Sequence, residues 1–541
     1  MEHQEIMKII KFHITNPFLI FFLLLFCFSC STEPSSNKHQ DFILDEITID
    51  DIHSGYKSDK YTVKDIVKKY IDRIREIDKS GPAINSVIIV NPDALVIADS
   101  LDQIHKQGGA KGPLFGIPVL LKDNIDTYDK MPTTAGSRVL RNSFPIQDSW
   151  VAKKLREAGA VILGKTNLSE WANYRASYSS SGWSGVGGQT KNPYVLDRNP
   201  CGSSSGSAVA VSANLCAIAV GTETWGSIMC PSNANGIIGI KPTVGLWSRS
   251  GIIPISYTQD TAGPMARTVK DAARLLGAIT GIDVSDPKTK QSLGKSHINY
   301  TRFLKETDLA GKRIGYLKTM EGKNHHVDDL MYRAIDDLEN LGAEIIELDK
   351  IVESSPGGFG AEQNSIEVMA HEFKDGLKKY FNNLGKDAPV SNLKEAIEAT
   401  LADSIEMLYF NLDRMNNSQS RGSLDSKIYK KSLQNMLEAF RDNGLDRVMD
   451  KHDLDAIISP TGSPAWKTDL INGDKYYIST TVYAALSGYP NINVPMGFIG
   501  NVPVGVSFYG RAWSEPLLLQ IAYAYEQNTM HRRAPEFLVT D

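Results

Sequence analysis

Cysteine is scarce in this sequence, and its spacing argues against one common kind of site. The 541 residues include five cysteines, and the four that would remain after removal of an N-terminal signal segment (Cys30, Cys201, Cys216 and Cys230) contain no C-x-x-C pair. A structural zinc site is therefore not expected, and no motif implies a metal or an organic cofactor. Cys201, Cys216 and Cys230 could pair in an exported protein. Because Cys216 and Cys230 lie among apolar or small residues, we predict buried free thiols instead.

An excess of charge of one sign is also missing. The net charge is −5, and no long basic run occurs outside the extreme N-terminus. Electrostatics therefore give no reason to expect a nucleic-acid partner. The sequence has no internal repeat and no low-complexity tract, and its 42% hydrophobic and 22% charged residues are typical of a globular protein. The oligomeric state is not predicted.

The apolar run near the N-terminus is too short to span a membrane as a helix. It extends from Phe18 to Phe28 behind a basic start, as in the central part of a signal peptide. Cys30 follows a small residue, as at a bacterial lipoprotein cleavage site. We predict a lipoprotein-type signal peptide over 1–30, lipidation of Cys30 and a flexible tether over 31–45. The protein would then be exported and attached to a membrane through the lipid only. An ordinary signal peptide or an uncleaved anchor is the alternative.

Strand-like and helix-like segments alternate in the rest of the chain, which predicts an α/β fold. The segment 61–81 has the spacing of an amphipathic helix, with a capping box that begins at Thr62. A buried strand is predicted to end just before Lys122, followed by the helix "SWVAKKLREAGA" and the strand "VILG". Long charged segments such as "DDLMYRAIDDLENLGAEIIEL", which we predict to be helical, indicate a helical lobe over about 283–450. One domain over 46–541 carries this lobe, and strands near the C-terminus complete its core.

No histidine lies between His105 and His297, although this interval contains the serine-rich stretch "NPCGSSSGSAVAV". The stretch matches G-x-S-x-G at Ser204, the pattern of a nucleophile elbow. An elbow follows a strand, whereas the preceding "KNPYVLDRNP" contains two prolines and two asparagines. A Ser-His-acid triad is therefore disfavoured. "GAVILGKT" (159–166) matches a P-loop, but a helix precedes it and a strand fills it, so nucleotide binding is not expected.

Without histidine, a serine nucleophile needs another base, and a buried lysine can serve. Lowering the pKa of a lysine from about 10.4 to neutrality takes about 3.5 units, or roughly 5 kcal/mol. Only a lysine in a dry interior meets that requirement. Lys122, directly after the apolar "GIPVLL", is the best candidate. Lys165 follows "VILG" in the same way, so position alone does not choose between them, and a solvated strand-end charge is the alternative for either.

Three segments together closely resemble the amidase signature family. They are "GIPVLLKDNID" (116–126), "NPCGSSSGSAVAV" (199–211) and the stretch 221–273 that begins "GTETWGSIMCPSNANG". The sequence of residues 164–200 and the segment "GVSFYGRAWSEPLLL" near the C-terminus are most similar to the peptide-amidase branch. The resemblance implies a large mixed β-sheet core with helices on both faces. It also implies hydrolysis of a linear carboxamide, either a small molecule or a peptide C-terminal amide, to a carboxylate and ammonia or an amine.

The family uses a Ser-cisSer-Lys triad, which the resemblance carries over residue by residue. Lys122 takes the place of the lysine, Ser203 that of the bridging serine on a cis peptide bond, and Ser227 that of the nucleophile. Ser227 would attack the amide and pass its proton through Ser203 to neutral Lys122, forming an acyl-enzyme. Ser204, at the centre of the elbow match, would then not be the nucleophile.

The loop before Ser227 is implied to bind the substrate and the oxyanion through Thr224, Trp225 and Gly226. Two residues depart from the common family pattern, Ser205 and Trp225, where most relatives carry glycine. We hypothesise that the indole of Trp225 restricts the site or makes it more apolar. Two alternatives to an active amidase remain: a catalytically impaired binding protein on the same fold, and a glutamine amidotransferase A-type subunit, which the predicted export signal disfavours.

Overall fold

The computed structural model describes residues 42–109, 111–304, 308–352 and 361–541. The predicted signal peptide, Cys30 and most of the predicted tether lie outside these ranges. Within them, one 11-stranded sheet has the order β1-β3-β2-β6-β8-β7-β12-β13-β11-β9-β10, and two short strands, β4 and β5, pair separately. The strands are β1 (Val87–Val90), β2 (Pro118–Lys122), β3 (Val161–Thr166), β4 (Trp183–Ser184), β5 (Gly188–Gln189), β6 (Ile218–Glu223), β7 (Ile238–Lys241), β8 (Thr261–Ala266), β9 (Arg313–Leu317), β10 (Glu344–Leu348), β11 (Ala456–Pro460), β12 (Asn491–Ile499) and β13 (Val502–Tyr509).

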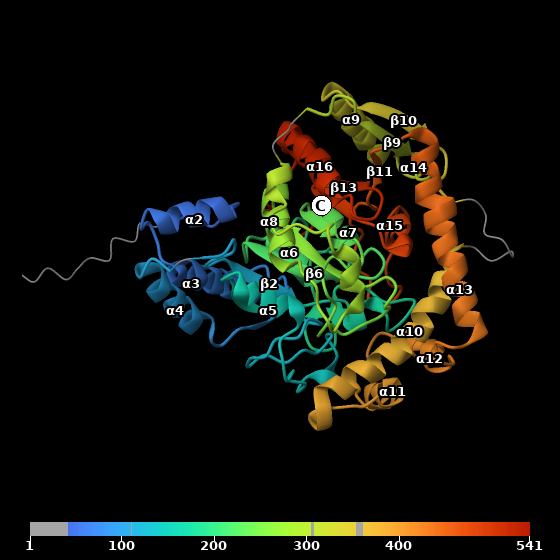
Figure 1. Ribbon diagram of the computed structural model, residues 1–541. Helices are drawn as coiled ribbons and strands as arrows, with labels where there is room; N and C mark the ends of the chain where they lie inside the picture. The colour runs from blue at the N-terminus through green and yellow to red at the C-terminus, as the bar shows by residue number, and fades with distance from the viewer. Residues whose placement is uncertain (1–41, 110, 305–307, 353–360) are drawn as a thin grey trace, which may run out of the picture. The chain divides into compact units, whose positions relative to one another are not determined.

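Helices cover both faces of this sheet, as Figure 1 shows. The α-helices are α2 (Ile49–Lys57), α3 (Val63–Arg73), α4 (Ala94–Lys106), α5 (Trp150–Glu157), α6 (Ser205–Ser212), α7 (Met229–Ala234), α8 (Val269–Ile279), α9 (His325–Asn340), α10 (Ala361–Leu384), α11 (Leu393–Leu401), α12 (Asp413–Gln419), α13 (Lys427–Leu437), α14 (Arg447–His452), α15 (Val482–Ser487) and α16 (Glu515–Thr529). Segments of π-helix extend α3 (Ile74–Asp78) and α13 (Glu438–Asp446). The predicted α/β fold with a mixed sheet is confirmed.

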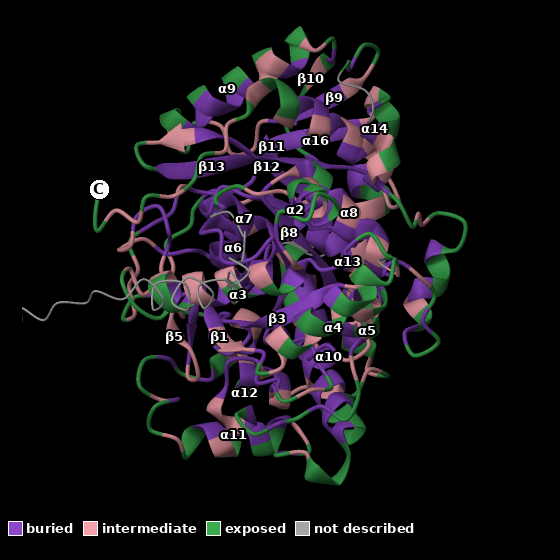
Figure 2. Cartoon of the chain, turned by 90° about the vertical axis from the view of Figure 1, so that its left-hand side faces the viewer, coloured by how far each residue is buried: buried purple, intermediate pink, exposed green. Residues whose placement is uncertain are grey.

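The sheet is mixed because it contains both parallel and antiparallel strand pairs. β2 pairs in parallel with β3 and β6, β6 pairs antiparallel with β8, and β12 pairs antiparallel with β7 and β13. The middle strands are buried along their whole length, as the purple ribbons of Figure 2 show. Strands covered on both faces are expected to be continuously apolar, which explains runs such as "PVLL" in β2.

The local patterns of the first third of the chain are confirmed. Thr62 and Asp65 form the predicted capping box at the start of α3, each side chain accepting from the other residue's backbone N–H. "VILGKT" is the buried strand β3, and α5 precedes it, so the P-loop match has neither the strand before it nor the helix after it.

Residues 283–450, for which a helical lobe is predicted, contain strands as well as helices. This range contributes β9 and β10, which pair in parallel at one edge of the main sheet. The predicted helix over "DDLMYRAIDDLENLGAEIIEL" is split: α9 ends at Asn340, Gly342 adopts φ +95°, and β10 starts at Glu344. Glycine alone adopts this left-handed backbone without cost, so it marks the change from helix to strand. The long helices of the range, α10 and α13, pack against each other.

Candidate active site

Lys122 is the last residue of β2 and is fully buried. Its Nζ lies 2.7 Å from Ser203 Oγ, 3.0 Å from Ser204 Oγ and 2.9 Å from Thr222 Oγ1. Burial lowers the pKa of Lys122 to about 7, although the charges of Glu223 and Asp260 act in the opposite direction. An amine with this pKa is neutral in about half of the molecules at pH 7, so it can accept a proton there.

Ser203 and Ser204 lie where a loop enters helix α6. The Gly202–Ser203 peptide bond is cis, and Ser204 is the residue before the helix. Ser204 Oγ donates to the carbonyl of Thr222 (2.9 Å) and accepts from its N–H (3.1 Å). Its hydroxyl is therefore held against β6 and the lysine, and Ser204 is not among the residues that line the neighbouring cavity. Ser204 is placed as a support for Lys122, not as an exposed nucleophile.

Ser227 lies in the turn between β6 and α7 and lines a cavity of about 690 Å³. Its backbone carbonyl accepts from the N–H of Ser204 (3.1 Å), which joins this turn to the loop of Ser203. Gly226 before it has φ +81°, and a Cβ there would come 2.9 Å from Thr481 Oγ1. In the described chain, the backbone N–H groups of Trp225, Gly226 and Ser227 donate to no protein acceptor. Such unpaired N–H groups beside a hydroxyl can stabilise an oxyanion.

Two buried acids that the sequence analysis missed shape this turn. Glu223 Oε2 accepts from the N–H groups of Ile228 (2.8 Å) and Met229 (3.1 Å), so it closes the turn over residues 224–227. Asp260 accepts from the Thr224 hydroxyl, and burial raises the pKa of Asp260 to about 6. An acidic residue at the end of the buried strand "AIAVGTE" was the available signal for Glu223, because an unpaired charge there would be costly.

Trp225 forms part of the cavity wall, and its indole is half-buried. The side chain packs against two apolar clusters, one that includes Ile255 and Met369 and one that includes Phe440 and Val482. It therefore connects the catalytic turn with helices α10 and α15 and with the π-helical continuation of α13. The remaining lining includes Met320, Ile366, Tyr476 and Tyr477 together with Asn173, Ser177, Asp413 and Arg414.

Lys165, the second candidate base, has a different role in the structure. Its Nζ bonds the carbonyl of Ile125 (2.7 Å) and the hydroxyl of Thr133 (2.9 Å), and it lies 3.9 Å from Asp123 Oδ1. It holds the loop that follows β2 and contacts none of the three serines. Lys122 is thus the lysine that reaches a serine. No histidine occurs among the residues that line the described cavity, which agrees with chemistry that uses no histidine.

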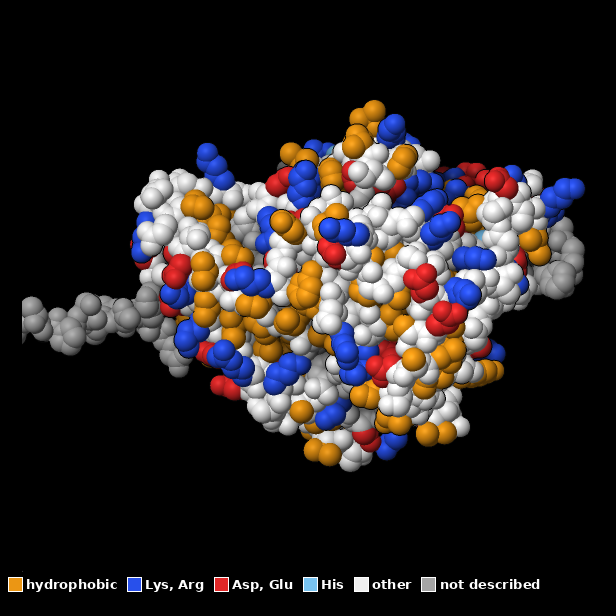
Figure 3. All heavy atoms as spheres, turned by 90° about the horizontal axis from the view of Figure 1, so that it is seen from below, with side chains coloured by type: hydrophobic (Ala, Val, Ile, Leu, Met, Phe, Trp, Pro, Cys, Tyr) orange, Lys and Arg blue, Asp and Glu red, His pale blue; other side chains and the backbone are white. Residues whose placement is uncertain are grey.

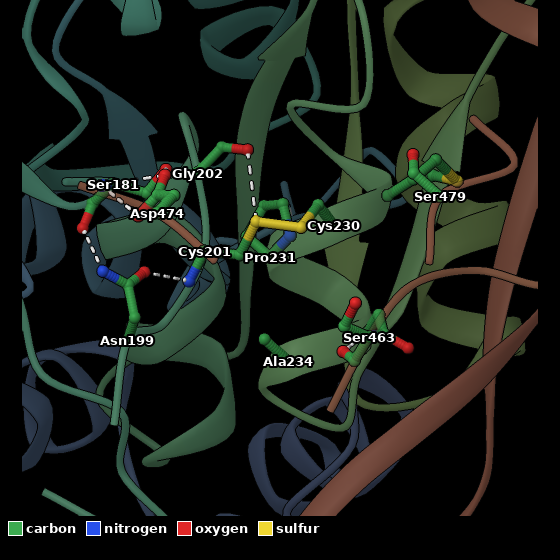
Figure 4. The surroundings of a disulfide bond; sticks show 12 residues. Ser181, Asn199, Cys201, Gly202, Cys230, Pro231, Ala234, Ser463, Asp474 and Ser479 are labelled. Carbon is green, nitrogen blue, oxygen red and sulfur yellow. Dashed lines mark hydrogen bonds between the residues drawn. A yellow bond between two sulfur atoms is a disulfide. The ribbon is translucent and has the colours of Figure 1, made fainter. Parts of the chain in front are cut away.

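Cys201 and Cys230 form a disulfide, which corrects the prediction of free thiols at these positions (Figure 4). Their Cα atoms are 5.8 Å apart, within the range that a disulfide spans. The prediction was wrong because it judged each cysteine by its neighbours in sequence, whereas the fold brings the loop before Ser203 against α7. Cys216 is free and buried, as predicted, and burial raises the pKa of its thiol to about 12.

The described residues contain neither a membrane-spanning helix nor a cluster of metal ligands. No helix there combines the length and the apolar character that crossing a membrane requires. No three His, Cys, Asp or Glu side chains there are grouped in a way that could hold a metal ion. On the face shown in Figure 3, basic and acidic side chains are interspersed.

Comparisons with known proteins indicate the same family over almost the whole chain. A model of the amidase family matches residues 65–519. A "probable amidase" of Arabidopsis thaliana is 41% identical over 504 residues, 92% of this chain and 93% of that protein. The A-type component of the glutamyl-tRNA(Gln) amidotransferase of Microcystis aeruginosa is 33% identical over 518 residues, 91% of this chain and 99% of that protein.

Two solved structures are similar as well. The peptide amidase PAM in complex with the competitive inhibitor chymostatin has 43% sequence identity and a TM-score of 0.88, over 92% of this chain and 100% of that one. The native peptide amidase from Stenotrophomonas maltophilia has 42% identity and a TM-score of 0.87 over the same shares. The range that the family model matches contains Lys122, Ser203 and Ser227.

Proposed function

Because this chain belongs to the amidase signature family, whose members hydrolyse amide C–N bonds, we propose that it removes the C-terminal amide of peptides or of similar linear carboxamides. The observation that carries the proposal is a buried lysine with a pKa of about 7, bonded to Ser203 beside the turn of Ser227. The similarity to peptide amidases supports the choice of a peptide amide.

Ser227 is the nucleophile in this proposal, because among Ser203, Ser204 and Ser227 it is the one that lines the cavity. Its oxygen attacks the carbonyl carbon of the amide, and its proton passes to Ser203 while Ser203 gives its own proton to neutral Lys122. The relay then runs backwards and protonates the nitrogen, so that the C–N bond breaks and ammonia leaves. Water hydrolyses the acyl ester on Ser227 by the same proton path, which yields the carboxylate.

The oxyanion of each tetrahedral intermediate is stabilised by backbone N–H groups of the turn 225–227. These groups donate to no acceptor among the described residues, and the turn is fixed by Glu223 and by Gly226. Fixed donors need no reorganisation during the reaction, and the loss of one typically costs about 10²–10³ in rate.

The cavity favours an amide whose acyl part carries an apolar or aromatic side chain. Trp225, Ile255, Met369 and Val482 form apolar surface next to Ser227. A volume of about 690 Å³ is in the range of cavities that enclose most of a drug-sized ligand, and it exceeds what a small aliphatic amide fills. Polar groups of the lining, among them Asn173, are available for the peptide backbone.

A glutamine amidotransferase A-type subunit is the second candidate, favoured by the relative in Microcystis aeruginosa. Export to the cell envelope, which we propose from the signal-peptide pattern of residues 1–30, is unexpected for that chemistry. The Cys201–Cys230 disulfide also supports an oxidising compartment, because structural disulfides are rare in the cytosol. We further propose that Cys30 is lipidated and attaches the protein to the membrane.

Ammonia release by the purified full-length chain tests the function. The panel contains C-terminally amidated peptides with apolar or polar last residues, small aliphatic amides and free glutamine. We expect release from amidated peptides and its loss by about 10⁴-fold or more in Ser227→Ala and in Lys122→Ala. Ser232→Ala is the matched control, since this buried serine lies in α7 and its hydroxyl has no partner among the described residues.

Three results would contradict the proposal. Release that persists in Ser227→Ala would remove Ser227 from the mechanism, and release from glutamine alone would favour the amidotransferase component. If the unsubstituted protein released ammonia from no amide of the panel, the catalytically impaired binding protein would be favoured. Trp225 would then be the first residue to replace.

A further inference from the structure

We propose that the Cys201–Cys230 disulfide is a positioning element of the catalytic centre, so that turnover depends on its oxidation state. The inference rests on the proposed function, because it assigns the bond a role in the chemistry of Ser203 and Ser227. It concerns two cysteines that touch neither the lysine nor the reacting oxygen.

The position of the bond along the chain is the first observation. Cys201 lies two residues before Ser203, and Cys230 lies three residues after Ser227. The disulfide therefore joins the loop that enters α6 to the first turn of α7 (Figure 4). These are the two segments whose serines must exchange a proton, and they come from places 29 residues apart in sequence.

The backbone at both cysteines is hydrogen-bonded to residues that lie near Ser203 or Ser227 in the sequence. The carbonyl of Cys201 accepts from Ser205 Oγ at 2.6 Å, and its N–H donates to Asn199 Oδ1 at 2.8 Å. The N–H of Cys230 donates to the carbonyl of Gly226 at 2.8 Å, in the turn that carries the proposed oxyanion donors. A shift of either sulfur therefore moves the backbone next to Ser203 or next to Ser227.

Among the described residues, two hydrogen bonds join the two segments directly. The N–H of Ser204 donates to the carbonyl of Ser227 at 3.1 Å, and Asn235 Nδ2 donates to the carbonyl of Pro200 at 2.8 Å. Single hydrogen bonds of this kind contribute modestly and allow small displacements. Proton transfer between hydroxyls does not tolerate such displacements, since a misplacement of 1 Å can cost about 100-fold in rate.

The bond can be reached from solvent through the substrate cavity. Cys201 and Cys230 both line it, and Cys230 is partly exposed. Dithiothreitol supplies the electrons and protons for reduction: the S–S bond breaks, each cysteine sulfur gains a proton, and the reagent closes to its cyclic disulfide. The free Cys216 is fully buried and offers an internal control.

The experiment compares the oxidised full-length parent, the parent reduced with dithiothreitol, and the double variant Cys201→Ala/Cys230→Ala. Alkylation and mass spectrometry count the thiols, and all assays run well below the measured Tm of each sample. We expect kcat on the amidated peptide to fall between about tenfold and 100-fold in both reduced parent and double variant, with KM changed less than twofold. Reoxidation restores the parent, whereas the variant does not respond to dithiothreitol. Cys216→Ala keeps the parent's activity and its sensitivity to reduction.

A second readout separates this inference from the proposed function. The rate at which a fluorophosphonate labels Ser227 reports on the nucleophile without any amide, and it is expected to fall with the disulfide. If the parent is labelled but hydrolyses no amide, the proposed substrate is wrong and the labelling rates still decide the inference. Reduced protein that carries both thiols and keeps its kcat or labelling rate would overturn it, as would absence of labelling in the oxidised parent. A rise in KM with unchanged kcat would mean that the disulfide shapes only the substrate cavity, and this result would also overturn the inference.

Discussion

The pH dependence of turnover is the sharpest test of the lysine base. Burial lowers the pKa of Lys122 to about 7, and only the neutral amine can take the proton of Ser203. Activity therefore rises with pH through this value. The neutral fraction is about 9% at pH 6 and about 91% at pH 8, so kcat/KM on an amidated peptide should rise about tenfold between them.

Glu223→Gln is the perturbation that assigns this rise to Lys122. The carboxylate of Glu223 raises the pKa of Lys122, so its replacement by a neutral amide lowers that pKa further. We expect the midpoint of the pH profile to move to lower pH. Glutamine has the same shape and keeps an acceptor for the N–H groups of Ile228 and Met229, so the turn is preserved.

The assay is initial-rate ammonia release from pH 5 to pH 9 at constant ionic strength, with kcat/KM fitted at each pH. Asp260→Asn serves as a second variant, because the pKa of Asp260 is raised to about 6 by burial and its own titration falls nearby. If Lys122 is the base, the rise persists in Asp260→Asn and its midpoint also moves to lower pH. A profile that stays flat between pH 6 and pH 8, or a midpoint that does not move in Glu223→Gln, would refute the assignment.

Three further substitutions test the cavity and the turn. Trp225→Gly should lower kcat/KM for amides with apolar side chains by about tenfold or more, because the indole contributes apolar contact. The same substitution should leave kcat/KM for small aliphatic amides nearly unchanged. An equal gain or loss on all amides would contradict this prediction. Trp225→Asp should reverse the preference toward substrates with a basic side chain, measured on the same panel. Gly226→Ala should lower the free energy of unfolding by about 1–2 kcal/mol, measured by denaturant unfolding, because alanine at φ +81° is strained and approaches Thr481. It should also reduce kcat. An unchanged kcat would show that the geometry of this turn does not affect catalysis.

The parts of the site that the sequence predicted are those with a local signal. An apolar strand that ends in a lysine can be recognised from a few consecutive residues, and Lys122 lies at the end of a buried strand as expected. The contacts that the sequence analysis missed join distant segments. The partner of Cys201 depends on how α7 packs, and the role of Glu223 depends on a turn that bends back over its own strand.

The error over 283–450 has a different cause. β10 is an edge strand with exposed and half-exposed positions, so "EIIEL" keeps the charges that a surface helix also carries. Local composition cannot separate the two cases, and only the parallel pairing with β9 decides. The prediction that Ser203 and Ser227 act together rests on the resemblance to a known family, because no local pattern singles out these two serines.

The seclusion of Lys122 has a consequence for the survival of the enzyme. An uncharged primary amine attacks esters readily, and in the proposed mechanism an ester forms on Ser227 in every cycle. Transfer of that acyl group to Lys122 would form a stable amide and irreversibly inactivate that enzyme molecule. Lys122 does not line the described cavity, and its nitrogen is surrounded by Ser203, Ser204 and Thr222. In the proposed mechanism Ser203 is thus a spacer as well as a proton carrier, and it would protect Lys122 from acylation by the intermediate on Ser227.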